Sequence, residues 1–177
     1  ASFEPLPGAM AHSGTLGQAA YRIEMPSAWN GELLLWAHGI HGFGPEVRAE
    51  NPPPALRRVL ISQGYAWAAS SFSENGFVPG IATNDTLTLK QYFAQQFGRP
   101  KRTYIAGASM GGNVVTLSLE NFPGEFDGGL SFCGVVAGEE WIDYLLAWAM
   151  AAEFIAGVEL PLDEGPAKVT EVLETQL

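Results

Sequence analysis

The segment from Tyr104 to Gly112, YIAGASMGG, places one serine between glycines where a strand is expected to meet a helix. The apolar residues before Gly107 favour a buried strand, and those after Gly111 favour a helix that ends at Pro123. The pattern G-x-S-x-G at such a junction is typical of a strained turn that presents a nucleophilic serine. We therefore interpret Ser109 as a nucleophile; the alternative is an ordinary glycine-rich turn with an incidental serine.

A second glycine-rich segment follows an apolar run at residues 32–37, ELLLWA. Such a run between glycines is expected to form a central strand that is covered on both faces. It leads into HGIHGFG at residues 38–44. A strand that ends in His-Gly, followed roughly seventy residues later by G-x-S-x-G, resembles the α/β-hydrolase superfamily.

In that superfamily, two backbone N–H groups form the oxyanion hole, which stabilises the tetrahedral intermediate. The resemblance implies that Met110, the residue after the serine, donates one N–H group. The loop after the early strand would donate the other from Ile40 or, if the loop register differs by one residue, from His41. His38 is expected to shape this loop by hydrogen bonding, with a catalytic role as the alternative. Gly39 and His41 would shape the loop or contact the substrate.

Three segments narrow the resemblance: PSAWNG at residues 26–31, GYAWAASS at 64–71 and GASMGG at 107–112. Together they are similar to secreted bacterial esterases of the feruloyl-esterase, polyhydroxyalkanoate-depolymerase and prolyl-oligopeptidase-like branches. The likeness covers about residues 18–138 and implies hydrolysis of carboxylic esters through an acyl-enzyme on Ser109. A peptidase of the same fold and a non-catalytic, hydrolase-like binding protein are the alternatives.

Strand and helix patterns alternate along the rest of the chain up to residue 138. Strands are expected at residues 18–25, 65–70 and 128–135, and helices at 52–64 and 85–97. The strands at 65–70 and 128–135 are expected to be buried. Asp85 is expected to cap the second helix, and His12 is expected in an exposed loop. This alternation predicts an α/β fold, in which helices cover both faces of a mostly parallel sheet. Ser109 would then lie at the carboxyl ends of the strands, where such sheets bind ligands.

Residues 139–177 have a different texture and form a second predicted region, after an N-terminal part of a hydrolase core at residues 1–138. A helix is expected over residues 139–152, almost wholly apolar from Tyr144 onward, and another over residues 165–173. The first is either a buried core helix or a cap over the active site. In a cap, Trp141 and Trp148, with Met150, would line an acyl-binding pocket.

All the histidines of the chain precede Ser109: His12, His38 and His41. In α/β-hydrolases the chain order is serine, acid, histidine. The resemblance therefore implies that the fold is incomplete C-terminally, and that a C-terminal fragment or a second chain supplies the acid and the histidine. Glu139 and Glu140 stand where some members carry the acid, although acids also suit a first helical turn.

The composition excludes several classes of partner. The 177 residues carry a net charge of −10, which argues against nucleic acid or an anionic membrane as a partner. The chain contains no phosphate-loop, HExxH or CxxC pattern, so no metal or cofactor is implied. Neither a membrane span nor a signal segment is recognisable, and Cys133 is expected to be a buried thiol. The start at Ala1 and the scarcity of lysine favour a secreted or periplasmic protein.

Overall fold

The computed structural model describes residues 3–138, 140–161 and 164–176. It divides into two compact units, Ala1–Val136 and Ala137–Leu177.

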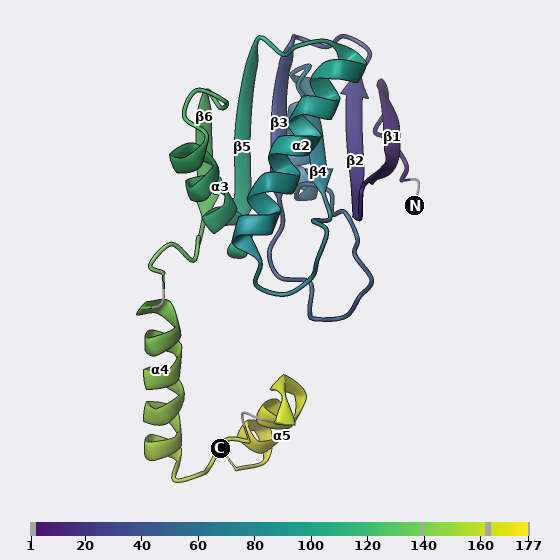
Figure 1. Cartoon of the computed structure of the whole chain (residues 1–177). Coiled ribbons are helices and arrows are strands. Elements are labelled where there is room, and N and C mark those ends of the chain that lie inside the picture. Colours follow the sequence, from purple (N-terminus) through teal and green to yellow (C-terminus); the bar gives the residue numbers. More distant parts are fainter. Residues whose placement is uncertain (1–2, 139, 162–163, 177) are drawn as a thin grey trace. The chain divides into compact units, whose positions relative to one another are not determined.

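The first unit is built on one sheet of six strands in the order β1-β2-β4-β3-β5-β6 (Figure 1). The strands are β1 (Ala9–Leu16), β2 (Ala19–Pro26), β3 (Glu32–Ala37), β4 (Ala66–Ser70), β5 (Arg102–Ala108) and β6 (Gly128–Phe132). β2 pairs antiparallel with β1 and β4, whereas β4, β3, β5 and β6 run parallel to one another. The mostly parallel sheet confirms the predicted α/β fold.

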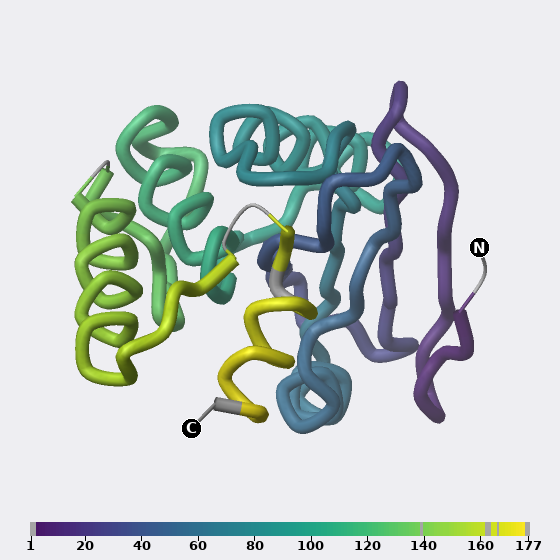
Figure 2. Tube along the Cα trace, turned by 90° about the horizontal axis from the view of Figure 1, so that it is seen from below, coloured from purple at the N-terminus to yellow at the C-terminus, as the bar shows by residue number. Residues whose placement is uncertain are grey.

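Helices cover both faces of the sheet because its strands are apolar on both sides. Figure 2 shows α1 (Pro54–Ser62) on one face, with α2 (Pro79–Phe97) and α3 (Met110–Asn121) on the other. Alternate residues of β3 divide between the two cores: Leu33 and Leu35 pack on the side of α2 and α3, and Trp36 packs on the side of α1. Packing on both faces therefore holds the strands, and with them both ends of the sheet, rigidly in place.

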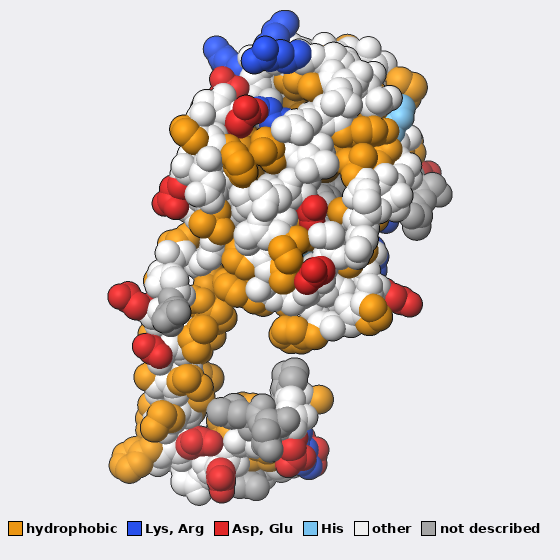
Figure 3. Space-filling view, viewed as in Figure 1, with side chains coloured by type: hydrophobic (Ala, Val, Ile, Leu, Met, Phe, Trp, Pro, Cys, Tyr) orange, Lys and Arg blue, Asp and Glu red, His pale blue; other side chains and the backbone are white. Residues whose placement is uncertain are grey.

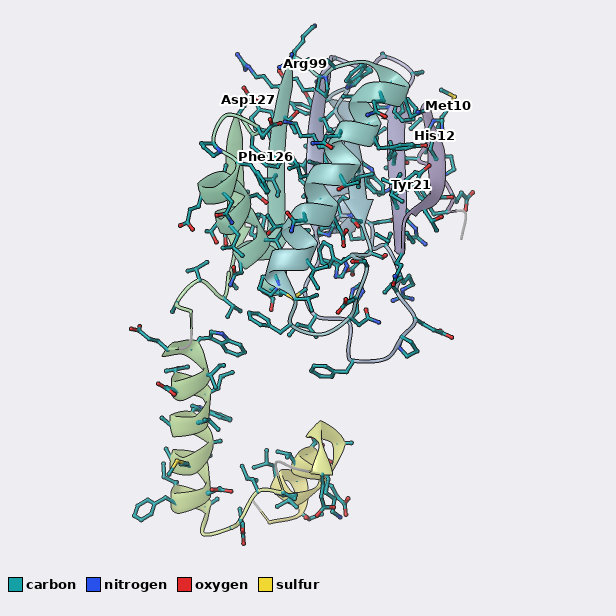
Figure 4. The ribbon with its side chains drawn as sticks, viewed as in Figure 1. Met10, His12, Tyr21, Arg99, Phe126 and Asp127 are labelled. Carbon is teal, nitrogen blue, oxygen red and sulfur yellow. The ribbon has the colours of Figure 1, made fainter. Side chains whose placement is uncertain are left out.

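Two N-terminal features differ from the prediction. His12 lies in β1 rather than in a loop (Figure 4). Its ring meets that of Phe97 edge-on, with centroids 4.9 Å apart. β1 is a strand because it forms a hairpin with β2, which its small and polar residues do not signal. Helix α2 begins at Pro79, so Asp85 lies inside it. The Asp85 carboxylate instead accepts hydrogen bonds from the N–H and Oγ–H of Ser73, at 2.7 and 2.8 Å.

The last strand is exposed, whereas the sequence predicted a buried one. Leu130 and Phe132 are 55% and 43% exposed, and the thiol of Cys133 is also exposed. The reason is that side chains stand on the faces of a sheet, and α3 covers only one face of β6, whereas Leu130 borders an open hollow on the other. The outer edge of β6 is also unpaired among the described strands. Such an open apolar edge is prone to associate with further strands.

The second unit contains α4 (Glu140–Ala156) and α5 (Pro166–Gln176). Glu140 and Asp143 lie in the first turn of α4, where acids complement the helix dipole. Most large apolar side chains of α4 are exposed, among them that of Trp148. Glu139 lies outside the described residues, and the role of this segment as a cap stays a prediction. None of the described helices combines the length and the apolar character that crossing a membrane requires.

Candidate active site

Ser109 forms the turn between β5 and α3, and it is exposed. Its backbone has a φ of 56° and a ψ of −122°, a region that residues with a side chain rarely occupy. The neighbouring elements hold this strained turn. The Ser109 N–H group donates to the carbonyl of Phe132 at 3.0 Å, and its own carbonyl accepts from the Gly112 N–H group at 2.9 Å. β6 and α3 thus fix the turn that presents the hydroxyl.

The glycines on either side of Ser109 allow α3 to approach the sheet closely. A Cβ atom on Gly107 would lie 2.3 Å from the carbonyl oxygen of Gly111. A Cβ atom on Gly111 would lie 2.0 Å from the carbonyl oxygen of Ala37, at the end of β3. Any larger residue would therefore push the helix away from both strands, and the serine with it.

The loop after β3 passes beside this turn. A Cβ atom on Gly39 would lie 3.4 Å from Cβ and 3.8 Å from Oγ of Ser109. The N–H group of Met110, the first residue of α3, has no intrahelical acceptor because it lies in the first turn. Among the described residues, neither this N–H group nor that of Ile40 donates a hydrogen bond. The predicted donors thus have free N–H groups on the two segments that flank the serine.

His38 is buried beside this loop. Its Nδ1 atom lies 2.6 Å from the carbonyl oxygen of Gly39, and its ring stacks against Phe72 and His41. Burial lowers the pKa of His38, and the neighbouring His41 lowers it further, against the opposing effect of the Gly39 carbonyl. The ring is therefore mostly neutral at pH 7. Within the described part of the chain, no side chain forms a hydrogen bond with Ser109 Oγ.

Glu50 joins this cluster, although nothing in the sequence pointed to it. Its Oε2 atom lies 3.0 Å from Nε2 of His41. His38, His41 and Glu50 bring three potential metal ligands within 4.8 Å of one another. However, the two rings are stacked with an interplanar angle of 5°. An ion about 2.0–2.1 Å from a nitrogen of each ring would lie far outside both ring planes, where neither lone pair points. The cluster therefore does not suit a metal ion in this geometry.

On the face drawn in Figure 3, Lys and Arg side chains gather at one end of the first unit. Figure 4 places Arg99 and Asp127 at this end, where β5 begins. Ser109 follows the other end of β5.

Two predicted pocket residues, Trp141 and Trp148, belong to the second unit, so their part in an acyl pocket stays a prediction.

A family model matches more than half of the chain. The model of the Tannase-like family of unknown function (DUF6351) matches residues 11–146. The chain belongs to this family. No curated protein matches the chain significantly.

This chain matches only part of several solved structures with a similar fold. S-formylglutathione hydrolase from Agrobacterium tumefaciens is 16% identical with a TM-score of 0.59, over 82% of this chain and 66% of that one. The serine hydrolase FphF from Staphylococcus aureus is 14% identical with a TM-score of 0.56, over 76% and 60%. Acetyl xylan esterase from Aspergillus awamori is 14% identical with a TM-score of 0.56, over 73% and 53%. The chain therefore has the α/β-hydrolase fold and spans less than two-thirds of each of these proteins.

Proposed function

We propose that this chain supplies the nucleophile and the oxyanion hole of a serine hydrolase that cleaves carboxylic esters. One observation carries the proposal: exposed Ser109 is held at a φ of 56° between β5 and α3. Backbone strain of this kind persists only where the surrounding structure enforces it, and it is concentrated at functional sites. The free N–H groups of Met110 and Ile40 support the same conclusion.

The chemistry follows from these groups. Ser109 Oγ attacks the ester carbonyl while a histidine base accepts the hydroxyl proton. The N–H groups of Met110 and Ile40 stabilise the oxyanion of the tetrahedral intermediate, and one such donor is typically worth about 10²–10³ in kcat. The histidine then protonates the departing alcohol, which leaves an acyl group on Ser109. Water, activated by the same histidine, releases the acid and restores the serine.

We further propose that the histidine and its acid come from a C-terminal part or a second chain that completes the fold. All three histidines precede Ser109 in the sequence. A hollow of about 350 Å³ on the α1 side of β5 and β6 is lined largely by apolar side chains, including Leu34, Tyr104 and Leu130. An apolar face of this kind beside an unpaired strand edge favours cover by further chain. A secreted or periplasmic location belongs to the same proposal and rests on the composition alone.

Replacement of the serine tests the proposal in the complete protein. Ser109→Ala should abolish hydrolysis of p-nitrophenyl acetate and leave the melting temperature close to that of the parent. Ser13→Ala is the matched control, because Ser13 is exposed on β1. An unchanged rate in Ser109→Ala would refute the proposal. Faster cleavage of a peptide p-nitroanilide than of the ester would keep Ser109 as the nucleophile but favour a peptidase.

A further inference from the structure

We propose that His38, His41 and Glu50 are positioning residues that hold the Gly39–Ile40 peptide with its N–H group directed toward the oxyanion hole. The inference rests on the proposed function, because it concerns the second oxyanion donor, Ile40. It assigns a role to a cluster that contacts the Gly39 carbonyl, next to the serine, without a hydrogen bond to the serine hydroxyl.

His38 Nδ1 forms a hydrogen bond with the Gly39 carbonyl oxygen, at 2.6 Å. A carbonyl oxygen only accepts, so Nδ1 must carry the hydrogen, and the neutral ring must be the Nδ1–H tautomer. Nε2 is then the unprotonated nitrogen, and it is buried without a hydrogen-bond donor. The carbonyl of Ser71 also lies near the ring and, like that of Gly39, raises the pKa of His38.

This hydrogen bond restrains the peptide between Gly39 and Ile40. The described chain contains no cis peptide bond, and in a trans peptide the C=O and N–H groups point in opposite directions. A bond that fixes the Gly39 carbonyl therefore also fixes the direction of the Ile40 N–H group. Glycine imposes little backbone preference of its own, so without this bond the peptide could rotate and withdraw the donor.

The His38 ring is itself held between two other rings. Phe72 stacks on the ring with centroids 4.2 Å apart. The backbone of Phe72 is anchored, because its N–H group donates to Ser70 Oγ at 3.0 Å and its carbonyl accepts from Ser71 Oγ at 2.7 Å. On its solvent side, His38 stacks on His41, with centroids 3.9 Å apart, and Glu50 holds His41 through Nε2. The ring thus has little freedom to turn Nδ1 away from Gly39.

Two replacements of His38 in the complete protein separate the donor from the ring. His38→Phe keeps an aromatic ring for stacking but has no hydrogen to donate, whereas His38→Asn keeps an N–H donor near the place of Nδ1 but has no ring. His38→Phe should lower kcat for p-nitrophenyl acetate about 10- to 100-fold, somewhat less than full loss of an oxyanion donor. KM should change little, and His38→Asn should recover part of kcat. A KM effect without a kcat effect would overturn the inference.

The role of Glu50, which holds His41, is tested by replacing its carboxylate. Glu50→Ala should lower kcat less than His38→Phe does, because it only loosens His41. Glu50→Gln, which can still bind the His41 ring, should retain most of kcat. Glu46→Ala is the control, because Glu46 is another exposed carboxylate of the same loop. Equal rates for Glu50→Ala and Glu46→Ala would contradict a role for Glu50.

The tautomer of His38 can be measured in the unmodified protein, so this test does not depend on the folding of a variant. Nitrogen-15 NMR of His38 should show the Nδ1–H tautomer, and the Nε2–H tautomer would overturn the inference. Failure of this inference can be told from failure of the proposed function. If His38→Phe keeps full kcat while Ser109→Ala is inactive, only the positioning role is wrong. If Ser109→Ala is fully active, the proposed function itself is wrong.

Discussion

Gly111 is the position where the structure makes the strongest demand on residue type. A Cβ atom there would lie 2.0 Å from the Ala37 carbonyl oxygen and 2.7 Å from that of His38. Ordinary van der Waals contacts begin at 3.4 Å, and both obstacles are backbone atoms that cannot rotate away. Overpacking of a core typically costs about 1–3 kcal/mol, so Gly111→Ala should lower the free energy of unfolding by roughly 3 kcal/mol.

The control for this substitution is Gly80→Ala. Gly80 and Gly111 are both the second residue of a helix, but a Cβ atom on Gly80 would meet nothing within 4 Å. Alanine is the better helix former, so Gly80→Ala should be neutral or stabilise by up to about 1 kcal/mol. Urea unfolding followed by the fluorescence of Trp36 and Trp67, which are buried in the sheet, would compare the two variants. Free energies within about 0.5 kcal/mol of each other would refute the close approach of α3 to β3.

Two other predictions concern acid stability and the cap. Burial alone would raise the pKa of Glu24, but hydrogen bonds from Arg57, the Leu6 N–H group and Trp67 outweigh it and lower that pKa. A carboxylate with a lowered pKa stabilises the fold above its unfolded pKa, and this contribution is lost as the pH falls through the folded pKa. Glu24→Gln should cost about 3 kcal/mol at pH 7 and make acid denaturation less steep; parallel stability curves in acid would contradict this. Trp148→Ala should raise KM for bulky esters and spare acetate esters; equal losses on both, with a lower melting temperature, would indicate an ordinary core helix.

The sequence predicted the elements with strong local signals. β3 is an apolar run between glycines, and the segment around Ser109 combines a strand, a glycine-rich turn and a helix start within a few residues. Features that depend on neighbouring elements escaped prediction. β1 is a strand because β2 pairs with it, and Leu130 of β6 is exposed because the α1 side of that strand is open.

The site was only partly predictable for a similar reason. Ser109 and the His38–Gly39 loop carry motifs, and the resemblance assigned Met110 and Ile40 from them. Glu50 carries no motif, because its position beside His41 depends on the path of a loop without periodicity. The stacking of Phe72 on His38 likewise depends on where β4 ends relative to β3, which the register of the sheet decides.

The most direct test of the account is covalent labelling of the complete protein with a fluorophosphonate, followed by mass spectrometry of its peptides. Such reagents react with a serine that a base has activated and an oxyanion hole supports. The account predicts one adduct, on Ser109, and parallel loss of labelling and ester hydrolysis in Ser109→Ala. An adduct on another residue, or an active esterase without label on Ser109, would contradict it.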